Sequence, residues 1–403
     1  MMSSLLRGCD EIITEADLAE RLAQSDREGR PLRVKLGVDP TAPMVTLGWA
    51  VVLRKLRDFQ RAGHTGVLII GDFTAMIGDP SGQSRTRPAL TREEVERNVN
   101  AVRGQLFKIL DPEKTEIRYN SEWLGRMNFA DVIRLASRTT VARILERDDF
   151  QKRLQAEKPI ALHEILYPLC QAYDSIAVKA DVELGGTDQK FNLLFGRNLQ
   201  EQFGIQPQIV VLLPLLVGLD GKQKMSQSLG NYIGITEDAN SMFGKVMSIP
   251  DHLIGSWFRL CTDVPEEEIS ALEHEMGEGM LNPRDAKLRL AKEIVRLYHS
   301  MEDAVRAREY FIKTFSKRET PTDVLEAEIP VTSLREGKVL LARLIADLGL
   351  AKSGAEAKRL IQQGGVTLDE EVVKDPSCTF ERSELVGKVL RVGKHKFRRL
   401  VGT

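Results

Sequence analysis

Apolar residues over positions 31–120 follow two alternating patterns. Segments 32–38 and 67–72 are short apolar runs bounded by Gly, Pro or Asp, which is typical of buried strands, and 116–120 has the pattern of a third strand. Between the first two segments, apolar residues recur at helical spacing, at Trp49, Val52, Leu53, Leu56 and Phe59. Thr91–Glu94 is a capping-box sequence that predicts another helix start. Strands separated by helices predict an α/β fold with parallel pairing through right-handed crossovers.

The later part of the chain has a mainly helical pattern. Residues 121–180 are predicted to be an insert of helices that interrupts the sheet before its last strand, near 209–217. Residues 236–325 are helical and charged, and their helices are separated by Pro250, Pro265 and Pro283.

The chain is predicted to form several domains, because 403 residues exceed one compact core. The tail has the pattern of two helices, over 338–348 and from Ser353, with strands near 366–368 and 389–392. We predict an α/β domain at 1–234, with a helical insert at about 121–180, and an α-helical domain at 235–325. A linker at 326–337 and a small α+β domain at 338–403 are predicted to follow.

Composition favours an ordinary globular protein, with 42% hydrophobic and 29% charged residues. The chain has no uncharged apolar run of about 18 residues, and its first residues lack an apolar segment of signal-peptide length. We therefore expect a cytoplasmic protein that does not associate with membranes. The four cysteines are scattered, which predicts neither disulfides nor a zinc site, and no other metal site is indicated.

Charge is unevenly distributed along the chain. Residues 338–403 carry 13 Lys and Arg against 8 Asp and Glu, although the whole chain has a net charge of −1. A basic tail on an acidic body favours a polyanionic partner held by the tail. A solvated cationic surface is the alternative.

Two segments could bind phosphate groups. The loop 222–230, Lys-Gln-Lys-Met-Ser-Gln-Ser-Leu-Gly, follows the predicted strand 209–217, and ligands of open parallel sheets bind outside such strand ends. The first strand leads through 37–49 into a helix start, where main-chain N–H groups favour phosphate and Gly48 permits close approach. A solvated lysine turn and a simple Pro/Gly turn are the respective alternatives.

Together with five further blocks, these segments resemble the class I aminoacyl-tRNA synthetases, and more specifically the bacterial tyrosyl-tRNA synthetases of the long-insert branch. The blocks occur in the family's order, at 71–82, 140–150, 167–174, 181–190 and 242–250. The resemblance extends from about residue 10 to the last residue. It implies a Rossmann-like catalytic domain, an α-helical anticodon-binding domain and an S-four-like RNA-binding tail.

The resemblance also implies roles for single residues. Asp174 resembles the acceptor for a tyrosine phenol, while Asp79 and Gln189 resemble groups that hold the substrate ammonium and carbonyl. The implied tyrosine-binding set is Gly37, Asp39, Asp79, Tyr167, Gln171, Asp174 and Gln189. The implied ATP-binding set is Gly48, Trp49, Gly186, Asp188, Lys224 and Gln227, and the implied catalytic set is Thr41, Thr46, Lys224, Ser226 and Gln227. For Asp79 and Asp174, a helix cap or a structural salt bridge is the alternative.

In the tail, the resemblance implies an RNA-binding surface of basic residues. Its members are Lys352, Lys358, Arg359, Arg391, Lys394, Lys396 and Arg398. Phosphate contacts of this kind are sensitive to salt and position an RNA without reading its sequence.

The phosphate-binding segments depart from the family's pattern. Thr46 and Trp49 stand where the family normally has two histidines, and Gln227 stands where it has a second lysine. Loss of one well-placed transition-state donor costs about 3–4 kcal/mol, so three losses predict slow adenylate formation unless Thr46, Gln227, Lys222 or Lys224 compensates. Trp49 is expected to pack beneath the helix rather than to stack on adenine.

The resemblance implies a tyrosine–tRNA ligase that uses tyrosine, ATP with Mg²⁺ and tRNA(Tyr), and that acts as a homodimer. The alternative is a catalytically weakened paralogue that binds tyrosine, an analogue or RNA as a sensor or specialised partner. A third interpretation, an unrelated nucleotide-binding α/β protein, would make the ordered blocks a coincidence.

Overall fold

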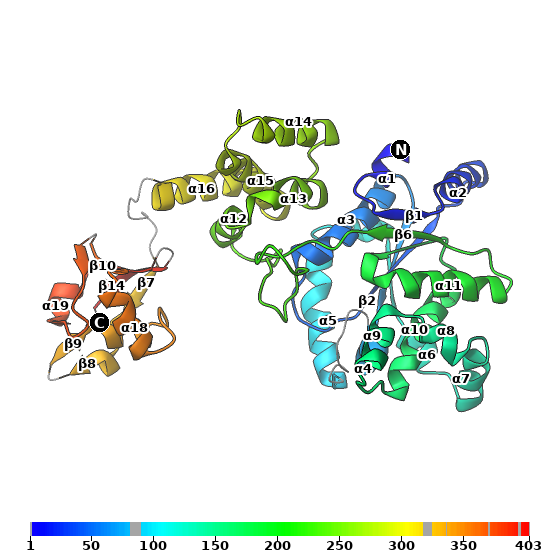
Figure 1. Ribbon diagram of the computed structural model, residues 1–403, viewed down its shortest axis with the longest axis horizontal. Helices are drawn as coiled ribbons and strands as arrows, with labels where there is room; N and C mark the ends of the chain where they lie inside the picture. Colours follow the sequence, from blue (N-terminus) through cyan, green and yellow to red (C-terminus); the bar gives the residue numbers. More distant parts are fainter. Residues whose placement is uncertain are drawn as a thin grey trace. The chain divides into compact units, whose positions relative to one another are not determined.

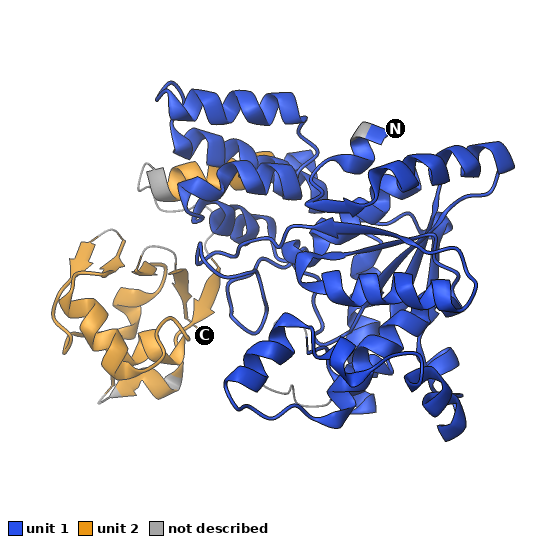
Figure 2. Ribbon diagram, turned by 45° about the vertical axis from the view of Figure 1, so that its right-hand side comes forward, with its two compact units in different colours: residues 1–304 blue, residues 305–403 orange. Residues whose placement is uncertain are grey.

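A computed structural model describes residues 2–80, 90–316, 325–335, 337–369, 371–393 and 396–402. The chain forms two compact units, Met1–Ala304 and Val305–Thr403, which Figure 2 shows in two colours. The boundary between the units falls inside α16 (Met301–Phe311).

The first unit contains a six-stranded sheet with the order β1-β6-β5-β2-β3-β4. Figure 1 labels β1, β2 and β6 of this sheet. Its strands are β1 (Glu11–Ile13), β2 (Arg33–Val38), β3 (Thr65–Ile70), β4 (Thr115–Tyr119), β5 (Val182–Gly186) and β6 (Ile209–Leu213). Strands β2 to β6 pair in parallel, which confirms the predicted α/β fold, and β1 pairs with β6 as an antiparallel edge.

The sheet differs from the sequence prediction at three strands. β5 is buried along its whole length but is not predicted, because Glu183 interrupts its apolar pattern. β6 ends at Leu213 rather than near 217, because Pro214 has no N–H to continue the ladder. β1 has only three residues, which is too short to show a period.

The order of the strands creates a switch point between β5 and β2. The chain crosses from β2 to β3 in one direction and from β5 to β6 in the other. Right-handed crossovers therefore place α3 (Leu47–Arg61) and α11 (Lys190–Gln202), the helices of these two connections, on opposite faces of the sheet. Ligands of such sheets bind at the carboxyl ends of the strands beside the switch point.

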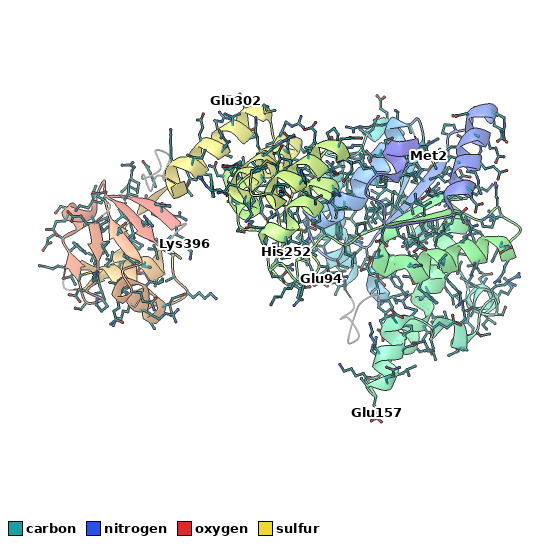
Figure 3. All side chains as sticks on the ribbon, turned by 45° about the horizontal axis from the view of Figure 1, so that its top comes forward. Met2, Glu94, Glu157, His252, Glu302 and Lys396 are labelled. Atoms are coloured by element: carbon teal, nitrogen blue, oxygen red, sulfur yellow. The ribbon has the colours of Figure 1, made fainter. Side chains whose placement is uncertain are left out.

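Local sequence explains where the helices around this point begin. Thr46 caps α3 by accepting a hydrogen bond from the Trp49 N–H. The predicted capping box of Thr91 and Glu94 is present at the start of α5 (Arg92–Leu106), and Figure 3 labels Glu94 there. The other helices before the insert are α1 (Met2–Leu6), α2 (Glu15–Glu28) and α4 (Thr74–Ile77).

The insert between β4 and β5 is helical, as predicted. Its helices are α6 (Ser121–Leu124), α7 (Phe129–Ala136), α8 (Val141–Ile144), α9 (Asp148–Gln155) and α10 (Leu162–Ala177). Ile144, Phe150 and Leu169 of these helices share a buried cluster with Phe195 and Leu199 of α11. Glu157, in the turn after α9, lies at the outer edge of this region (Figure 3).

The predicted helical region follows the sheet in the same unit. It contains α12 (Ala239–Met247), α13 (Ile254–Cys261), α14 (Glu266–Gly277), α15 (Pro283–Tyr298) and the start of α16. The predicted breakers act as helix starts: Pro250 and Pro265 are N-cap residues and Pro283 is the first residue of α15. Trp257 is fully buried and donates its indole N–H to the Val217 carbonyl at 3.1 Å.

The second unit begins with the rest of α16 and the short π-helix Ile312–Ser316. It then forms a five-stranded sheet, β11-β10-β13-β14-β7, and a three-stranded sheet, β12-β9-β8. Its strands are β7 (Glu326–Glu328), β8 (Leu334–Arg335), β9 (Lys338–Leu340), β10 (Val366–Leu368), β11 (Glu371–Val373), β12 (Thr379–Phe380), β13 (Val389–Val392) and β14 (Lys396–Val401). Its helices include α17 (Leu341–Asp347), α18 (Gly354–Gln362) and α19 (Arg382–Leu385).

Ser353 caps α18, as the sequence predicts, by accepting from the Glu356 N–H at 3.2 Å. The range predicted as a linker, 326–337, includes β7 and β8. The predicted boundaries of the four domains stay a prediction. Over the part of the chain that the structure describes, no helix is long and apolar enough to span a membrane.

Candidate active site

The face of β2 that contacts α10 has a gap in its row of side chains. Lys35, Gly37 and Asp39 alternate along this strand and its end, so they share one face. Lys35 donates to the Gln171 carbonyl and the Tyr167 hydroxyl donates to Asp39, both across to α10. A Cβ at Gly37 would meet no atom within 4 Å. The predicted tyrosine-binding residues Gly37, Tyr167 and Gln171 therefore surround an open space.

Asp39 is held from two neighbouring elements. Its carboxylate accepts from Thr74 Oγ1 at 2.7 Å and from the Tyr167 hydroxyl at 2.8 Å. Gly71, directly after β3, is required here, because a Cβ at this position would lie 2.0 Å from Asp39 Oδ1. Burial, together with the Asp39 and Asp79 carboxylates, raises the pKa of Tyr167 well above its ordinary value. Tyr167 therefore stays protonated and acts as a donor to Asp39.

Asp174 is a buried carboxylate whose side-chain donors are neutral. It is 4% exposed, and it accepts from Trp123 Nε1 at 2.7 Å and from Asn120 Nδ2 at 3.4 Å. Burial is the largest cause that raises the pKa of Asp174, to about 7, whereas Lys35 acts in the opposite direction. An additional donor from a ligand would stabilise the ionised carboxylate. Neither alternative for Asp174, a helix cap or a salt bridge, accounts for these contacts.

Asp79, Gln171 and Gln189 are linked through Asn192. Gln189 Nε2 donates to Asp79 Oδ2 at 2.8 Å. Asn192 Nδ2 donates to Gln171 Oε1 at 2.9 Å and to Gln189 Oε1 at 3.1 Å. The fold thus connects three predicted tyrosine-binding residues from the segment after α4, from α10 and from the turn after β5.

An ion pair lies buried beneath this network. Lys35 and Glu183 are 0% and 1% exposed, and Lys35 Nζ lies 2.8 Å from Glu183 Oε1. Lys35 also donates to Ser175 Oγ at 2.7 Å, and Ser175 Oγ lies 3.1 Å from Glu183 Oε2. Because Gln171, Asp174 and Ser175 all belong to α10, the pair fixes this helix against β2 and β5.

The sequence prediction missed several residues of this site. Thr74, Asn120 and Trp123 give no motif signal, because each acts on Asp39 or Asp174 only through the fold. For Lys35 and Glu183 only a partial signal was present, because charged residues interrupt the apolar pattern of both strands. Buried charges are normally paired, but Arg33 and Lys35 stand in the same strand, so the sequence does not show which cation meets Glu183.

The predicted phosphate segments meet at the start of α3. A Cβ at Gly48 would lie 3.4 Å from the Met225 Cβ, so the loop packs closely on the first turn of the helix. Thr46 is 2% exposed, and its hydroxyl oxygen caps the helix. Trp49 is half-buried, and Thr41 is exposed.

The loop 222–230 is held in place by hydrogen bonds of polar side chains. Asn231 accepts from the Ser226 N–H at 2.8 Å and donates to Asp220 Oδ2 at 3.1 Å. Lys224 Nζ lies 2.7 Å from Asp188 Oδ2, so two predicted ATP-binding residues pair with each other. The Gln227 amide donates to the Met44 carbonyl.

The remaining predicted positions lie around these groups. Ser226 Oγ lies 2.8 Å from Ser228 Oγ. Gly186 ends β5, where a Cβ would lie 2.8 Å from Asp188 Oδ1. Beside Thr41 is a pocket of about 390 Å³, lined by Thr41, Pro43, Leu90, Glu94, Arg97 and Asn98.

The predicted RNA-binding residues do not all share one face of the second unit. Lys352, Lys358, Arg359 and Lys396 are exposed, and the Lys396 ammonium, labelled in Figure 3, donates to the Leu350 carbonyl at 2.6 Å, close to Lys352. Arg391 lies opposite Phe397 in the β13–β14 pair, while Arg398 lies opposite Leu390, so these two arginines point to different faces. Lys394 lies outside the described residues.

Comparisons with known proteins identify the family of the chain. Residues 27–316 match the family described as tRNA synthetases class I (W and Y), and residues 339–386 match the S4 domain. The chain is 53% identical to the tyrosine–tRNA ligase of Moorella thermoacetica over 396 residues, which cover 98% of this chain and 94% of the relative. It is 54% identical to the tyrosine–tRNA ligase of Thermotoga maritima over 398 residues, with 99% and 96% covered.

Solved structures share the fold at lower identity. The tyrosyl-tRNA synthetase of Archaeoglobus fulgidus, complexed with L-tyrosine, is 23% identical with a TM-score of 0.60, covering 76% of this chain and 98% of that one. A truncated mitochondrial tyrosyl-tRNA synthetase of Aspergillus nidulans is 21% identical with a TM-score of 0.63, covering 76% and 92%. The family match and the full-length relatives show that the chain belongs to the class I tRNA synthetases, in the family of the bacterial tyrosine–tRNA ligases.

Proposed function

We propose that this chain is a tyrosine–tRNA ligase with a complete tyrosine pocket and a weakened phosphate site. In the reaction, a carboxylate oxygen of tyrosine attacks the α-phosphorus of ATP, and pyrophosphate leaves. A hydroxyl of the terminal tRNA ribose then attacks the tyrosyl carbonyl, and AMP leaves. ATP is the substrate that the family implies.

The observation that supports tyrosine as the substrate is the environment of Asp174. Its carboxylate is buried, its side-chain donors Trp123 and Asn120 are neutral, and it belongs to the same helix as Tyr167 and Gln171. A phenol hydroxyl would supply a further donor, whereas phenylalanine would supply none. The carboxylates of Asp79 and Asp39, which accept from Gln189 and Tyr167, are further acceptors that an ammonium group could use.

The phosphate side supports a slower first step. Positive or donor groups near a developing phosphate charge are the main source of rate in such a transfer. Here the Thr46 hydroxyl oxygen caps α3, and the Gln227 amide is bound to the Met44 carbonyl. Lys224 retains its charge but pairs with Asp188. These contacts also favour the second candidate, a weakened paralogue that binds tyrosine without activating it efficiently.

Tyrosine-dependent ATP–pyrophosphate exchange separates the two candidates. We expect measurable but slow exchange from the unaltered chain. Exchange at the rate of an active ligase would exclude the weakened paralogue and would also contradict the weakened phosphate site of our proposal. No exchange, together with normal tyrosine binding by calorimetry, would exclude the ligase.

Magnesium is proposed only as the ion that accompanies ATP. In the described ranges, no three His, Cys, Asp or Glu side chains gather into a group that could hold a metal ion. Phosphate oxygens are the ligands that Mg²⁺ would use.

The second unit is proposed to bind tRNA(Tyr) through Lys352, Lys358, Arg359 and Lys396. Neutralising one phosphate contact should reduce the slope of log affinity against log salt by about 1. We expect Lys358→Ala to do this, whereas Lys374→Ala, at an exposed position outside the predicted set, should leave the slope unchanged. Equal slopes for both variants and the unaltered chain would contradict the assignment.

A homodimer is proposed from the surface of the insert. Five large apolar side chains are exposed there: Phe129 (78%), Ile133 (54%), Val141 (60%), Leu154 (50%) and Leu162 (77%). Such groups on neighbouring helices are typical of a protein interface, and a second copy of the chain is the proposed occupant. We also propose a cytoplasmic location, where a ligase of this kind meets tRNA and ATP.

Sedimentation analysis tests the dimer. Phe129→Asp together with Leu162→Asp should convert a dimer into a monomer. Met280→Asp is the matched control, because Met280 is 68% exposed but lies outside the insert. A monomeric unaltered chain, or a dimer that survives the double substitution, would refute this interface.

A further inference from the structure

A buried arginine of the insert reaches the predicted tyrosine pocket through one amide. Arg147, the residue before α9, is 3% exposed, and its Nη1 donates to Asn192 Oδ1 at 2.5 Å. Asp149 holds the other side of the guanidinium with two contacts of 3.1 Å. The Arg147 guanidinium also lies over the rings of Phe150 and Phe191, at 5.1 and 5.6 Å from their centroids.

Asn192 is the third residue of α11 and is 1% exposed. Its Oδ1 faces Arg147, and its Nδ2 donates to Gln171 Oε1 at 2.9 Å and Gln189 Oε1 at 3.1 Å. One buried side chain therefore contacts two residues that are predicted to hold the amino acid.

The chemistry of arginine fixes which way these amides point. A guanidinium has donors and no acceptor, so the Asn192 oxygen must face it and the Asn192 nitrogen must face away. The two glutamine oxygens then accept from Asn192, which directs both glutamine nitrogens away from Asn192. Gln189 Nε2 accordingly donates to Asp79 Oδ2 at 2.8 Å, and Gln171 Nε2 points to Glu183 Oε1 at 3.4 Å.

We propose that Arg147 and Asn192 are positioning residues for tyrosine, because they set the donor and acceptor directions of Gln171 and Gln189. This inference rests on the proposed function, in which those two glutamines contact the substrate. Arg147 belongs to the insert that also carries the proposed dimer surface. The chain of hydrogen bonds therefore runs from the insert to the pocket.

Asn192→Asp tests the direction of the amides without changing the shape of the side chain. Aspartate still accepts from Arg147, but it presents an acceptor to Gln171 Oε1 and Gln189 Oε1. Both glutamines must then rotate, and Gln189 turns its oxygen toward the Asp79 carboxylate. We expect tyrosine to bind about tenfold more weakly or worse, because a buried hydrogen bond becomes a contact between acceptors.

Stability should not fall in the same variant. A negative charge in the first turn of α11 is favoured by the helix dipole, and Arg147 pairs with it. Asn198→Asp is the matched control, because it places the same charge at an exposed position of the same helix. It should retain normal tyrosine affinity.

A second pair of variants keeps the test informative if Asn192→Asp fails to fold. Arg147→Lys retains a donor-only cation, so tyrosine affinity should stay within about threefold of normal. Arg147→Met removes the donor and should weaken binding by about tenfold. A purely structural role would lower the melting temperature in both variants without this difference in affinity.

The measurement is tyrosine binding by calorimetry on the full chain, in the absence of ATP, with a melting curve for each variant. The positioning role is overturned if Asn192→Asp binds tyrosine as tightly as the unaltered chain does. It is also overturned if Arg147→Lys and Arg147→Met bind tyrosine equally tightly. Either result leaves the proposed function intact. No tyrosine binding by the unaltered chain overturns both.

Discussion

The proposed amino-acid side and the proposed phosphate side of the site use their polar groups differently. The carboxylates of Asp39, Asp79 and Asp174 are oriented by side chains from neighbouring elements. At the start of α3, by contrast, Thr46 and Gln227 bond to the main chain. The first arrangement prepares acceptors for a ligand, whereas the second uses its donors and acceptors within the loop and helix.

We infer from this difference that the proposed tyrosine pocket and the proposed phosphate site can change independently of each other. The tyrosine side depends on contacts between β2, β5, α10 and α11, which are also contacts of the buried core. The phosphate side depends on a helix start and a loop, where Thr46 and Gln227 bond to the nearby main chain rather than across the sheet. The following predictions test whether the two sides are separate.

The largest expected effect is a gain of rate in the triple variant Thr46→His, Trp49→His, Gln227→Lys. Each restored transition-state donor is worth roughly 100-fold to 1000-fold, so exchange should rise at least about 100-fold even if the gains are far from additive. Tyrosine-dependent ATP–pyrophosphate exchange measures this. Tyrosine affinity should change by no more than about threefold, because the three substituted residues belong to the start of α3 and to the loop 222–230. An unchanged exchange rate would show that these positions do not limit the first step.

The next largest effect is expected on stability, from Lys35→Met. Removing one partner of a buried ion pair leaves an uncompensated charge and costs about 3–5 kcal/mol. The double variant Lys35→Met, Glu183→Gln should recover most of this loss, because no unpaired charge remains. Denaturant unfolding measures both. If the single variant were as stable as the unaltered chain, the pair would not support the pocket in the way we describe.

Asp174→Asn should weaken tyrosine binding by roughly tenfold to 100-fold, because a hydrogen bond to a charged group is replaced by one to a neutral amide. Adenine nucleotide binding should be unaffected if the two sides are separate. Calorimetry with tyrosine and with ATP gives both values. Equal losses for the two ligands would contradict the separation.

The same variant should change how stability depends on pH. The pKa of Asp174 is raised from 3.8 to about 7 in the folded protein, so the folded state binds this proton more tightly than the unfolded chain. The contribution of Asp174 to stability is therefore present below pH 3.8 and is lost as the pH rises through 7. Asp174→Asn should become more stable than the unaltered chain above pH 7, by at most about 4 kcal/mol, and the gain should vanish in acid. A difference that is independent of pH would refute the raised pKa.

The smallest effect is expected from Gln227→Ala. The substitution removes a hydrogen bond to the Met44 carbonyl, which is worth about 1 kcal/mol in stability. Tyrosine affinity should remain within about twofold of normal, because the amide bonds to the loop before α3 and not to the pocket. Calorimetry checks this. A tenfold loss of tyrosine affinity would show that the two sides are coupled.

Several elements could be predicted from local sequence because local sequence causes them. The apolar runs of β2 and β3, the capping box of α5 and the Ser353 cap of α18 involve residues that are close in the chain. β5 could not be predicted in this way, because Glu183 is tolerated only through Lys35, which is distant in sequence. Proximity in the fold, rather than local pattern, decides whether a charge can lie in a strand.

The sequence by itself determined the α/β pattern, the order of the family's blocks and the three departures at Thr46, Trp49 and Gln227. It placed Asp79, Gln171, Asp174 and Gln189 near a substrate only through the resemblance. The tertiary structure alone decided how these side chains are oriented, through Trp123, Asn192 and Arg147. The physical reason is that hydrogen-bond direction depends on which donors and acceptors face each other, and the fold brings these residues together from different elements.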